Sequence, residues 1–257
     1  MSFEVNTTVV LFGGWGREAT ILKLNTIGYK IVAVVTPKDV TPKLQESINR
    51  IQEAGLNLIS CSKSNLEDVL HPFTQSTLLS IGFPYLLSEE ILKMFPLCLN
   101  VHPTLLPRYR GPTSGAYILI NNEPESGSTV HLMDAGMDTG AIVLQRKVQL
   151  SRFDTIRSLR RKVYSLEPDL VVDALALLKT PGFQPIPQDE SKSINYPKKR
   201  KPQDSEIDSN QSIAELFDTI RACDPDEFPA FFYIEGQKVC VRLWRPERPL
   251  EDEEDML

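Results

Sequence analysis

The sequence predicts an α/β fold: a Rossmann-like, mostly parallel sheet flanked by helices, followed by a small C-terminal subdomain with one helix and a β-hairpin. Three observations lead to this prediction. Short apolar runs alternate with segments of helical periodicity over residues 8–101. The composition shifts near residue 181 towards Pro, Ser, Lys and Gln. With 257 residues, 41% hydrophobic and 24% charged, the chain can form one sizeable domain and a small accessory one.

Strands and helices alternate through the first part of the chain. We expect strands at 8–12, 30–35, 57–60, 76–82 and 98–101, and helices at 16–27, 43–54, 65–70 and 88–94. In the segment 43–54, for example, Leu44, Ile48 and Ile51 share one helical face. Alternation of this kind favours right-handed crossovers and a parallel sheet with helices on both faces.

The pattern changes after residue 127. Two strands are expected at 128–133 and 141–148, joined by DAGMDTG, which suggests a hairpin-like element on the later edge of the sheet. A helical pattern follows at 156–178 and ends at Thr180-Pro181-Gly182. Pro168 is expected to break or kink that helix.

The residues after 181 predict three parts. The segment 182–204 is expected to be a linker that wraps the surface, with KKRK at 198–201 as a solvated basic turn rather than a phosphate contact. A helix at 212–221, capped by Ser209 or Asn210, precedes strands at 231–234 and 238–243 around a turn. The domain prediction is therefore 1–181, 182–204 and 205–257, with an acidic, frayed end EDEEDML.

Composition excludes several classes of protein. The net charge of −6 and the pI near 5.3 disfavour nucleic acid as the main ligand, because such binders carry a basic footprint. The N-terminus lacks the features of a signal peptide, and no run approaches the ~18 apolar residues of a membrane span. Cys61, Cys98, Cys223 and Cys240 form no CxxC pair, which predicts reduced thiols in a cytoplasmic protein, and no metal site is expected.

The turn after the first strand, FGGWGRE, is a weak match to a dinucleotide fingerprint. Its glycines fall at 13, 14 and 16, whereas the fingerprint requires G-x-G-x-x-G. The spacing disfavours NAD. A tight strand-to-helix turn remains, whose free N–H groups can still meet an anion.

The chain has three histidines, and one of them lies at a promising position. His71 precedes a proline in a loop, and His131 is expected at a half-buried strand position. His102 leaves a strand and follows Asn100 by two, so both side chains can face one cleft at the carboxyl end of a parallel sheet. Ordinary loop residues are the alternative interpretation.

The stretch MDAGMDTGA places two carboxylates, Asp134 and Asp138, in a glycine-rich loop. They are either turn residues, which Asp and Gly commonly are, or one of them faces the imidazole of His102. Spacing alone does not decide between these alternatives.

The motif N-x-H-x-x-L-L-P-x-x-R-G at 100–111, with MDAGMDTG and SIGFPYLLSEEIL at 80–92, resembles the folate-dependent formyltransferases. That family includes glycinamide ribonucleotide, methionyl-tRNA and sugar N-formyltransferases, and the resemblance covers about residues 5–180. It implies 10-formyltetrahydrofolate as formyl donor and an amine as acceptor. It also implies catalytic roles for Asn100, His102 and Asp138.

The resemblance also implies a pterin pocket built from two loops. Its candidate residues are Phe83, Tyr85, Leu86, Leu87, Asp134 and Met137. In the implied chemistry, Asn100 donates to the developing oxyanion, His102 moves a proton, and Asp138 orients the imidazole.

The residues beyond 181 resemble the post-catalytic segment of the sugar N-formyltransferases, and also that of the methionyl-tRNA enzymes. Charge favours a small anionic acceptor, so the prediction is a dTDP-, UDP- or GDP-linked amino sugar used for a surface polysaccharide such as the lipopolysaccharide O-antigen, and a homodimeric enzyme. Candidates for acceptor contacts are Gly14, Trp15, Arg108, Tyr109 and Arg110. The alternatives are a siderophore-type ornithine amine, methionyl-tRNA, or a sensor without turnover.

Overall fold

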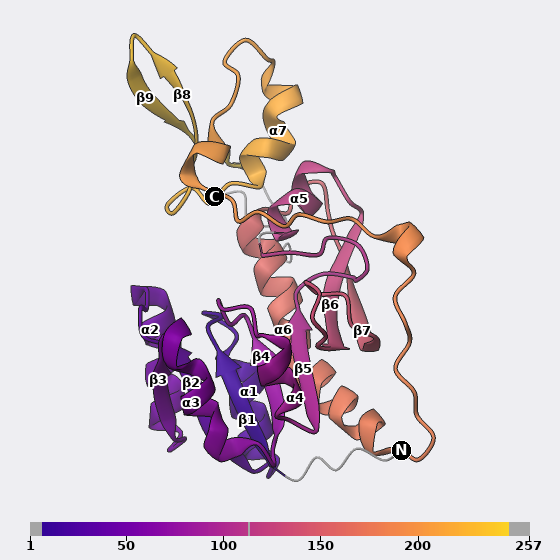
Figure 1. Ribbon diagram of the computed structural model, residues 1–257. Coiled ribbons are helices and arrows are strands. Elements are labelled where there is room, and N and C mark those ends of the chain that lie inside the picture. Colours follow the sequence, from indigo (N-terminus) through magenta and orange to yellow (C-terminus); the bar gives the residue numbers. More distant parts are fainter. Residues whose placement is uncertain (1–6, 113, 247–257) are drawn as a thin grey trace.

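The computed structural model describes residues 7–112 and 114–246 and contains one large sheet (Figure 1). Its seven strands follow the order β3-β2-β1-β4-β5-β6-β7. They are β1 (Thr8–Phe12), β2 (Ile31–Pro37), β3 (Leu58–Cys61), β4 (Thr77–Ile81), β5 (Leu97–His102), β6 (Glu125–Leu132) and β7 (Ile142–Gln149). The first five pair with one another in parallel, whereas β6 is antiparallel to both β5 and β7. The predicted fold class and the antiparallel pair on the later edge are confirmed.

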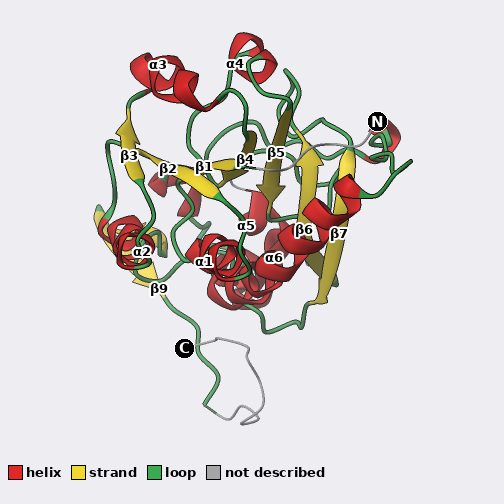
Figure 2. Cartoon of the chain, turned by 90° about the horizontal axis from the view of Figure 1, so that it is seen from below, coloured by secondary structure: helices red, strands yellow, loops and turns green. Residues whose placement is uncertain are grey.

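Helices cover both faces of the sheet, as Figure 2 shows. They are α1 (Glu18–Thr26), α2 (Pro42–Glu53), α3 (Leu66–Leu70), α4 (Glu89–Lys93), α5 (Ser114–Ile120), α6 (Ile156–Lys179) and α7 (Ile213–Arg221). One face carries α1, α2 and α6, and the opposite face carries α3 and α4. Among the helices of the described residues, none combines the length and the apolar character needed to cross a bilayer.

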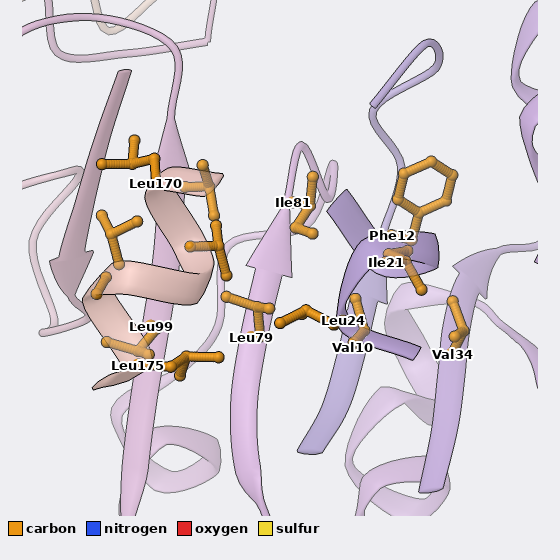
Figure 3. Packing of buried hydrophobic residues seen from close by; sticks show 14 of the residues in the cluster. Val10, Phe12, Ile21, Leu24, Val34, Leu79, Ile81, Leu99, Leu170 and Leu175 are labelled. Atoms are coloured by element: carbon orange, nitrogen blue, oxygen red, sulfur yellow. The ribbon is translucent and has the colours of Figure 1, made fainter. Parts of the chain in front are cut away.

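Strand alternation divides the apolar residues between two cores. Val10 and Phe12 of β1 belong to the cluster beneath α1 and α6, whereas Val9 and Leu11 point to the cluster under α3 and α4. All four side chains have no exposed surface. Figure 3 shows the first cluster, in which side chains of α1 and α6 meet those of four parallel strands. A strand buried on both faces explains the continuous apolar run in this part of the sequence.

Two local predictions are corrected by the structure, and one helix is added. The helix α6 continues through Pro168, which therefore does not break it; burial of the apolar side of α6 against the sheet outweighs the lost backbone bond. The cap of α7 is Ser212, not Ser209 or Asn210, because Ser212 and Glu215 form a reciprocal capping box. The short helix α5 was not predicted.

The C-terminal part contains α7 and a two-stranded sheet of β8 (Ala230–Ile234) and β9 (Gln237–Val241). The predicted hairpin is confirmed. Its two-residue turn has positive φ angles of 50° at Glu235 and 78° at Gly236, as a type I′ turn requires. Arg221 of α7 attaches this part to the rest by donating to the carbonyls of Asp154 and Leu119. The predicted frayed end lies outside the described residues.

The segment after α6 runs along the molecule from the end of that helix to the C-terminal part (orange in Figure 1). Residues 186–196, called the strap below, are hydrogen-bonded to the part of the chain that carries the large sheet. Ile186 and Ile142 exchange two backbone hydrogen bonds of 2.8 Å, and Arg110 exchanges two more, with Ile194 and Tyr196. The segment predicted as a linker therefore includes a part that is attached by backbone pairing.

Candidate active site

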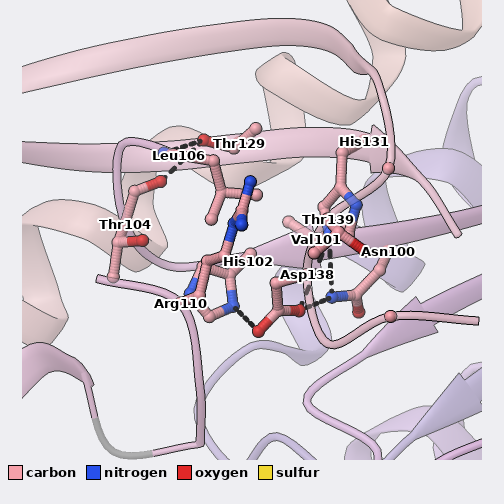
Figure 4. Close-up of polar contacts among 12 residues, drawn as sticks. Asn100, Val101, His102, Thr104, Leu106, Arg110, Thr129, His131, Asp138 and Thr139 are labelled. Carbon is pink, nitrogen blue, oxygen red and sulfur yellow. Dashed lines mark hydrogen bonds and ion pairs between the residues drawn. The ribbon is translucent and has the colours of Figure 1, made fainter. Parts of the chain in front are cut away.

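Three predicted residues converge where β5 ends (Figure 4). Asn100 and His102 lie on β5, and Asp138 lies on the loop between β6 and β7. The Asp138 Oδ1 atom accepts from Asn100 Nδ2 at 3.3 Å, and its Oδ2 atom is 3.5 Å from His102 Nδ1. A backbone N–H, that of Gly111, also donates to Oδ2 at 3.0 Å. The loop carboxylate therefore does face the imidazole, and the turn role belongs to the other aspartate.

That other residue, Asp134, organises the loop that carries Asp138. Its Oδ1 atom accepts from the hydroxyl of Thr139 at 2.5 Å and from the N–H of Gly136 at 3.0 Å. The carboxylate thereby closes a compact turn. Met137, next to Asp138, is half-buried.

A second histidine, His131, joins the cluster and was not predicted there. It is the direct neighbour of Asn100 across the β5–β6 pairing. Its Nδ1 atom lies 2.7 Å from the carbonyl of Leu132, so Nδ1 carries the proton and Nε2 accepts from Asn100 Nδ2 at 3.1 Å. The Nε2 atom is also 3.7 Å from Asp138 Oδ1. The only signal in the sequence was a polar residue on a buried strand.

The amide of Asn100 is held by these contacts. Its Nδ2 atom has two hydrogens, and one points to His131 while the other points to Asp138. Of the two bonds, the one to Asp138 is longer, at 3.3 Å. An oxygen atom of a bound ligand can therefore take over the hydrogen bond to Asp138 more easily than the one to His131.

The imidazole of His102 lies between two acceptors. Its Nε2 atom donates to the carbonyl of Tyr109 at 3.0 Å, so Nδ1, which faces Asp138, is the nitrogen that can take up a proton. Burial lowers the pKa of His102, and Asp138 and the Tyr109 carbonyl oppose that shift. Burial by itself would raise the pKa of Asp138, but His102, His131 and the Gly111 N–H together hold it below its ordinary value.

A buried ion pair lies beneath the cluster. Arg17, at the start of α1, donates to both carboxylate oxygens of Glu167 in α6, at 2.6 and 2.7 Å. The same guanidinium donates to the carbonyl of Val101 on β5. The hydroxyl of Ser128 is positioned to donate either to Glu167 or to the carbonyl of His102, each at 3.1 Å. The backbone of β5 around His102 is thus fixed from below by charged and polar groups.

The predicted pterin-pocket residues border one apolar cluster. Phe83 and Tyr85 pack edge to face with ring centroids 5.2 Å apart, and both lie against the core on the α3 and α4 side. Leu87 is buried in that core, whereas Leu86 is 61% exposed. Met133, which precedes the Asp134 turn, contacts the same cluster, so both predicted loops border the same side of the sheet.

The predicted acceptor contacts fall into two groups. Arg108, Tyr109 and Arg110 are occupied in protein contacts: Arg108 and the Tyr109 hydroxyl bind Glu123, and Arg110 binds the strap. Burial and Glu123 raise the pKa of Tyr109 to about 12. Trp15, in contrast, lines an open cavity. Gly14 is closely packed, because an added Cβ atom there would lie 2.8 Å from the Arg17 side chain.

The cavity next to Trp15 has a volume of about 670 Å³ and lies between the turn after β1, the first half of α6 and the loop after α7. Its basic and aromatic lining includes Trp15, Lys43, Arg157, Arg160, Arg161 and Tyr164. Lys43 and Arg160 both lie over the Trp15 ring, within 4.8 and 5.3 Å of its centroid. Asp224 and Asp226 also line the cavity and form ion pairs with Arg157.

A family model described as formyl transferase matches residues 13–175, from the turn after β1 through most of α6. This chain belongs to the formyl transferase family. The resemblance inferred from the motifs is thereby confirmed at the level of the family.

Relatives of this formyl transferase carry a more specific name. The methionyl-tRNA formyltransferase of Cyanothece sp. is 40% identical over 147 residues, which are 57% of this chain and 44% of the relative. That of Borreliella burgdorferi is 31% identical over 206 residues, which are 77% of this chain and 65% of the relative. The chain thus spans about half to two thirds of the length of these curated relatives.

Solved structures share the fold over more of the chain. A 4-N formyltransferase from Francisella tularensis has a TM-score of 0.74 at 24% identity and covers 93% of this chain and 97% of its own. The N-formyltransferase from Helicobacter canadensis, in complex with folinic acid and dTDP-3-aminofucose, has a TM-score of 0.71 at 20% identity, with coverages of 92% and 86%. At these identities the likeness establishes the fold, and its extent includes the C-terminal part.

Proposed function

We propose that this formyl transferase moves a formyl group from 10-formyltetrahydrofolate to the exocyclic amine of a nucleotide-linked amino-deoxy sugar. The observation that carries the proposal is the convergence of Asn100, His102 and Asp138 within 3.5 Å contacts at the carboxyl end of β5. In acyl transfer to an amine, an amide can stabilise the oxyanion, an imidazole can move the proton, and a carboxylate can orient the imidazole.

In the proposed reaction, Asn100, His102 and Asp138 have different roles. The amine nitrogen attacks the formyl carbon, and negative charge develops on the formyl oxygen. Asn100 stabilises that oxygen by donating to it the Nδ2 hydrogen that bonds to Asp138 in the free protein. The amine proton passes to Nδ1 of His102, where Asp138 stabilises the cation. The bond from the formyl carbon to the N10 nitrogen of the donor then breaks, and the proton is returned to that nitrogen.

The cavity next to Trp15 supports an acceptor that carries a diphosphate. Guanidinium groups recognise phosphate oxygens through paired N–H donors, and an indole ring can stack on a base. The proposed acceptor site uses Trp15, Arg160 and Arg161. The Helicobacter canadensis enzyme, which shares the fold over 92% of this chain, was solved with a dTDP-linked amino sugar, which agrees with this choice.

The first test is the substitution His102→Asn. We expect turnover to fall at least about a hundredfold while the folded fraction is unchanged, because proton transfer by a positioned group is lost. His71→Asn makes the same change at an exposed position and should leave turnover near normal. Near-normal activity of folded His102→Asn would refute the assignment.

The competing acceptor is methionyl-tRNA, which the names of the relatives with 31–40% identity favour. Formyl transfer should be measured with dTDP-, UDP- and GDP-linked amino sugars, methionyl-tRNA, hydroxyornithine and no amine at all. The proposal expects turnover with one of the nucleotide sugars. Turnover with methionyl-tRNA alone selects the competing function, and folate binding without turnover selects a sensor.

The remaining expectations concern the setting of the enzyme. We propose a cytoplasmic homodimer that supplies an amino sugar to a surface polysaccharide. The outer edge of β9 pairs with no further strand in the described part of the chain, which leaves an edge that a second copy can extend. Light scattering at several protein concentrations tests the dimer, and a constant mass of one chain contradicts it.

A further inference from the structure

The strap places one amide side chain against the loop of the catalytic carboxylate. Gln188 Nε2 donates to two backbone carbonyls, those of Asp138 at 2.8 Å and Gly140 at 2.7 Å. Its Oε1 atom accepts from Nε and Nη2 of Arg110, at 3.1 and 2.7 Å. The amide therefore joins two loops that are far apart in the sequence.

The loop at Asp138 needs support from outside. Asp138 has a φ angle of 56°, in the left-handed region that residues with a side chain rarely adopt. Such a conformation persists where surrounding contacts over-determine it. Within the loop, Asp134 holds one side of the turn. Gln188 holds the backbone of Asp138 from the other side.

Arg110 holds the other end of the Gln188 side chain and binds a second residue of the strap. Its guanidinium, with 4% of the side chain exposed, binds Gln188 and Glu190 of the strap. The next residue, Gly111, donates its N–H to Asp138 Oδ2. A Cβ atom on Gly111 would lie 2.1 Å from the Tyr196 carbonyl, which shows how closely the strap follows this loop. The strap thus touches both the loop that carries Asp138 and the loop that donates to its carboxylate.

We infer that Gln188 is a positioning residue for catalysis, which fixes Asp138 against His102 from a segment outside the sheet. The inference rests on the proposed formyl transfer and adds a residue to that site. Gln188 contacts no reacting atom; its effect is transmitted through the backbone of Asp138.

Loss of this contact has a defined electrostatic consequence. The charged and titratable groups that face His102 are Asp138, His131 and Arg17, and of these Asp138 alone favours the imidazolium. Withdrawal of the carboxylate leaves only the Tyr109 carbonyl to oppose burial and two unfavourable neighbours, so the pKa of His102 must fall further. Whichever protonation state is active, the limb of the pH–rate profile that belongs to His102 moves to lower pH.

The test compares Gln188→Met with Gln149→Met. Methionine keeps the length of the side chain and removes its hydrogen bonds, and Gln149 is an exposed residue of β7. For both variants we measure kcat and KM for donor and acceptor. We also measure the melting temperature and follow the imidazole titration by NMR. The chain has three histidines, so the imidazole signals can be assigned with His71→Asn and His131→Gln.

In Gln188→Met we expect kcat to fall about ten- to hundredfold, since small misplacements of a catalytic group cost that much. KM should change less than kcat, the melting temperature should fall by no more than about 8 °C, and the His102 titration should move to lower pH. Gln149→Met should match the parent protein.

Two outcomes overturn the inference. One is a kcat within about twofold of the parent with an unchanged His102 titration, since misplacement costs more. The other is a lower folded fraction with normal turnover per folded molecule, which makes Gln188 merely structural. If the parent protein transfers no formyl group, the proposed function fails. The NMR titration still decides whether Gln188 positions Asp138.

Discussion

The carboxylate of Asp138 meets two imidazoles, one amide and one backbone N–H at distances of 3.0 to 3.7 Å. These contacts keep its pKa below the unfolded value of about 3.9. As the pH falls, the unfolded chain takes up the proton first, so this stabilisation is present above about pH 4 and is lost below it. The lowered pKa of His102 acts in the same direction, but from about pH 6.5 downwards.

We therefore predict two separate windows in the dependence of stability on pH. Urea unfolding of the parent protein should show a falling free energy of unfolding from about pH 6.5, and a further fall below about pH 4. His102→Asn should remove much of the first decline, and Asp138→Asn much of the second. Identical pH profiles for all three proteins would contradict the coupling of these groups to folding.

His131 gives a second prediction at this scale. Its Nε2 atom accepts from Asn100, so His131→Leu should leave that amide poorly oriented and lower turnover about two- to tenfold, the worth of one hydrogen bond. His131→Gln offers a carbonyl acceptor and should recover part of the loss. Equal activity of the Leu and Gln variants would show that the acceptor is irrelevant.

Some site residues were predictable one by one and others were not. Asn100 and His102 could be paired because residues two apart in a strand point the same way. His131 could not be placed, since its position opposite Asn100 depends on the register between antiparallel strands, which the local sequence does not encode. Gln188 reaches the site across a long connection that local patterns do not describe.

Among the elements, α1 and α6 are joined by the buried pair Arg17–Glu167, with 3% and 0% of the side chains exposed. Glu167→Gln leaves the guanidinium without its counter-charge and should lower the free energy of unfolding by about 3–5 kcal/mol. The exposed pair Lys93–Glu89 offers a control, since Glu89→Gln should cost no more than about 0.5 kcal/mol.

Urea unfolding of both variants measures these differences. Replacing the buried pair together, Arg17→Met with Glu167→Leu, should recover most of the loss, because apolar groups of similar size replace buried ion pairs well. A Glu167→Gln variant as stable as the Glu89→Gln control would contradict the account.

The sequence pattern predicted best those elements that are buried on both faces or that are joined by a characteristic turn. The β1 run and the turn at Glu235–Gly236 belong to this group. The expectation of a break at Pro168 was wrong because tertiary contacts decide there, and α6 continues with its apolar side on the sheet.

For the whole molecule, we predict that donor and acceptor bind separately and that each stabilises the fold. Near a hundred times its Kd, a ligand adds about 2.7 kcal/mol, which raises the melting temperature by about 5–10 °C. A thermal-shift panel with folinic acid, dTDP, UDP and GDP measures this. Trp15→Ala should abolish the nucleotide shift and keep that of folinic acid. An unchanged nucleotide shift in Trp15→Ala would place the acceptor elsewhere.

The strap also limits how parts of such enzymes can be exchanged. A chimera that joined residues 1–181 of this chain to the corresponding C-terminal part of another formyl transferase would retain every strand of the large sheet. It would nevertheless replace the side chain that meets the carbonyls of Asp138 and Gly140. Swapping acceptor specificity by fusion at that junction would therefore alter reaction rate as well, unless the crossover were moved beyond residue 196.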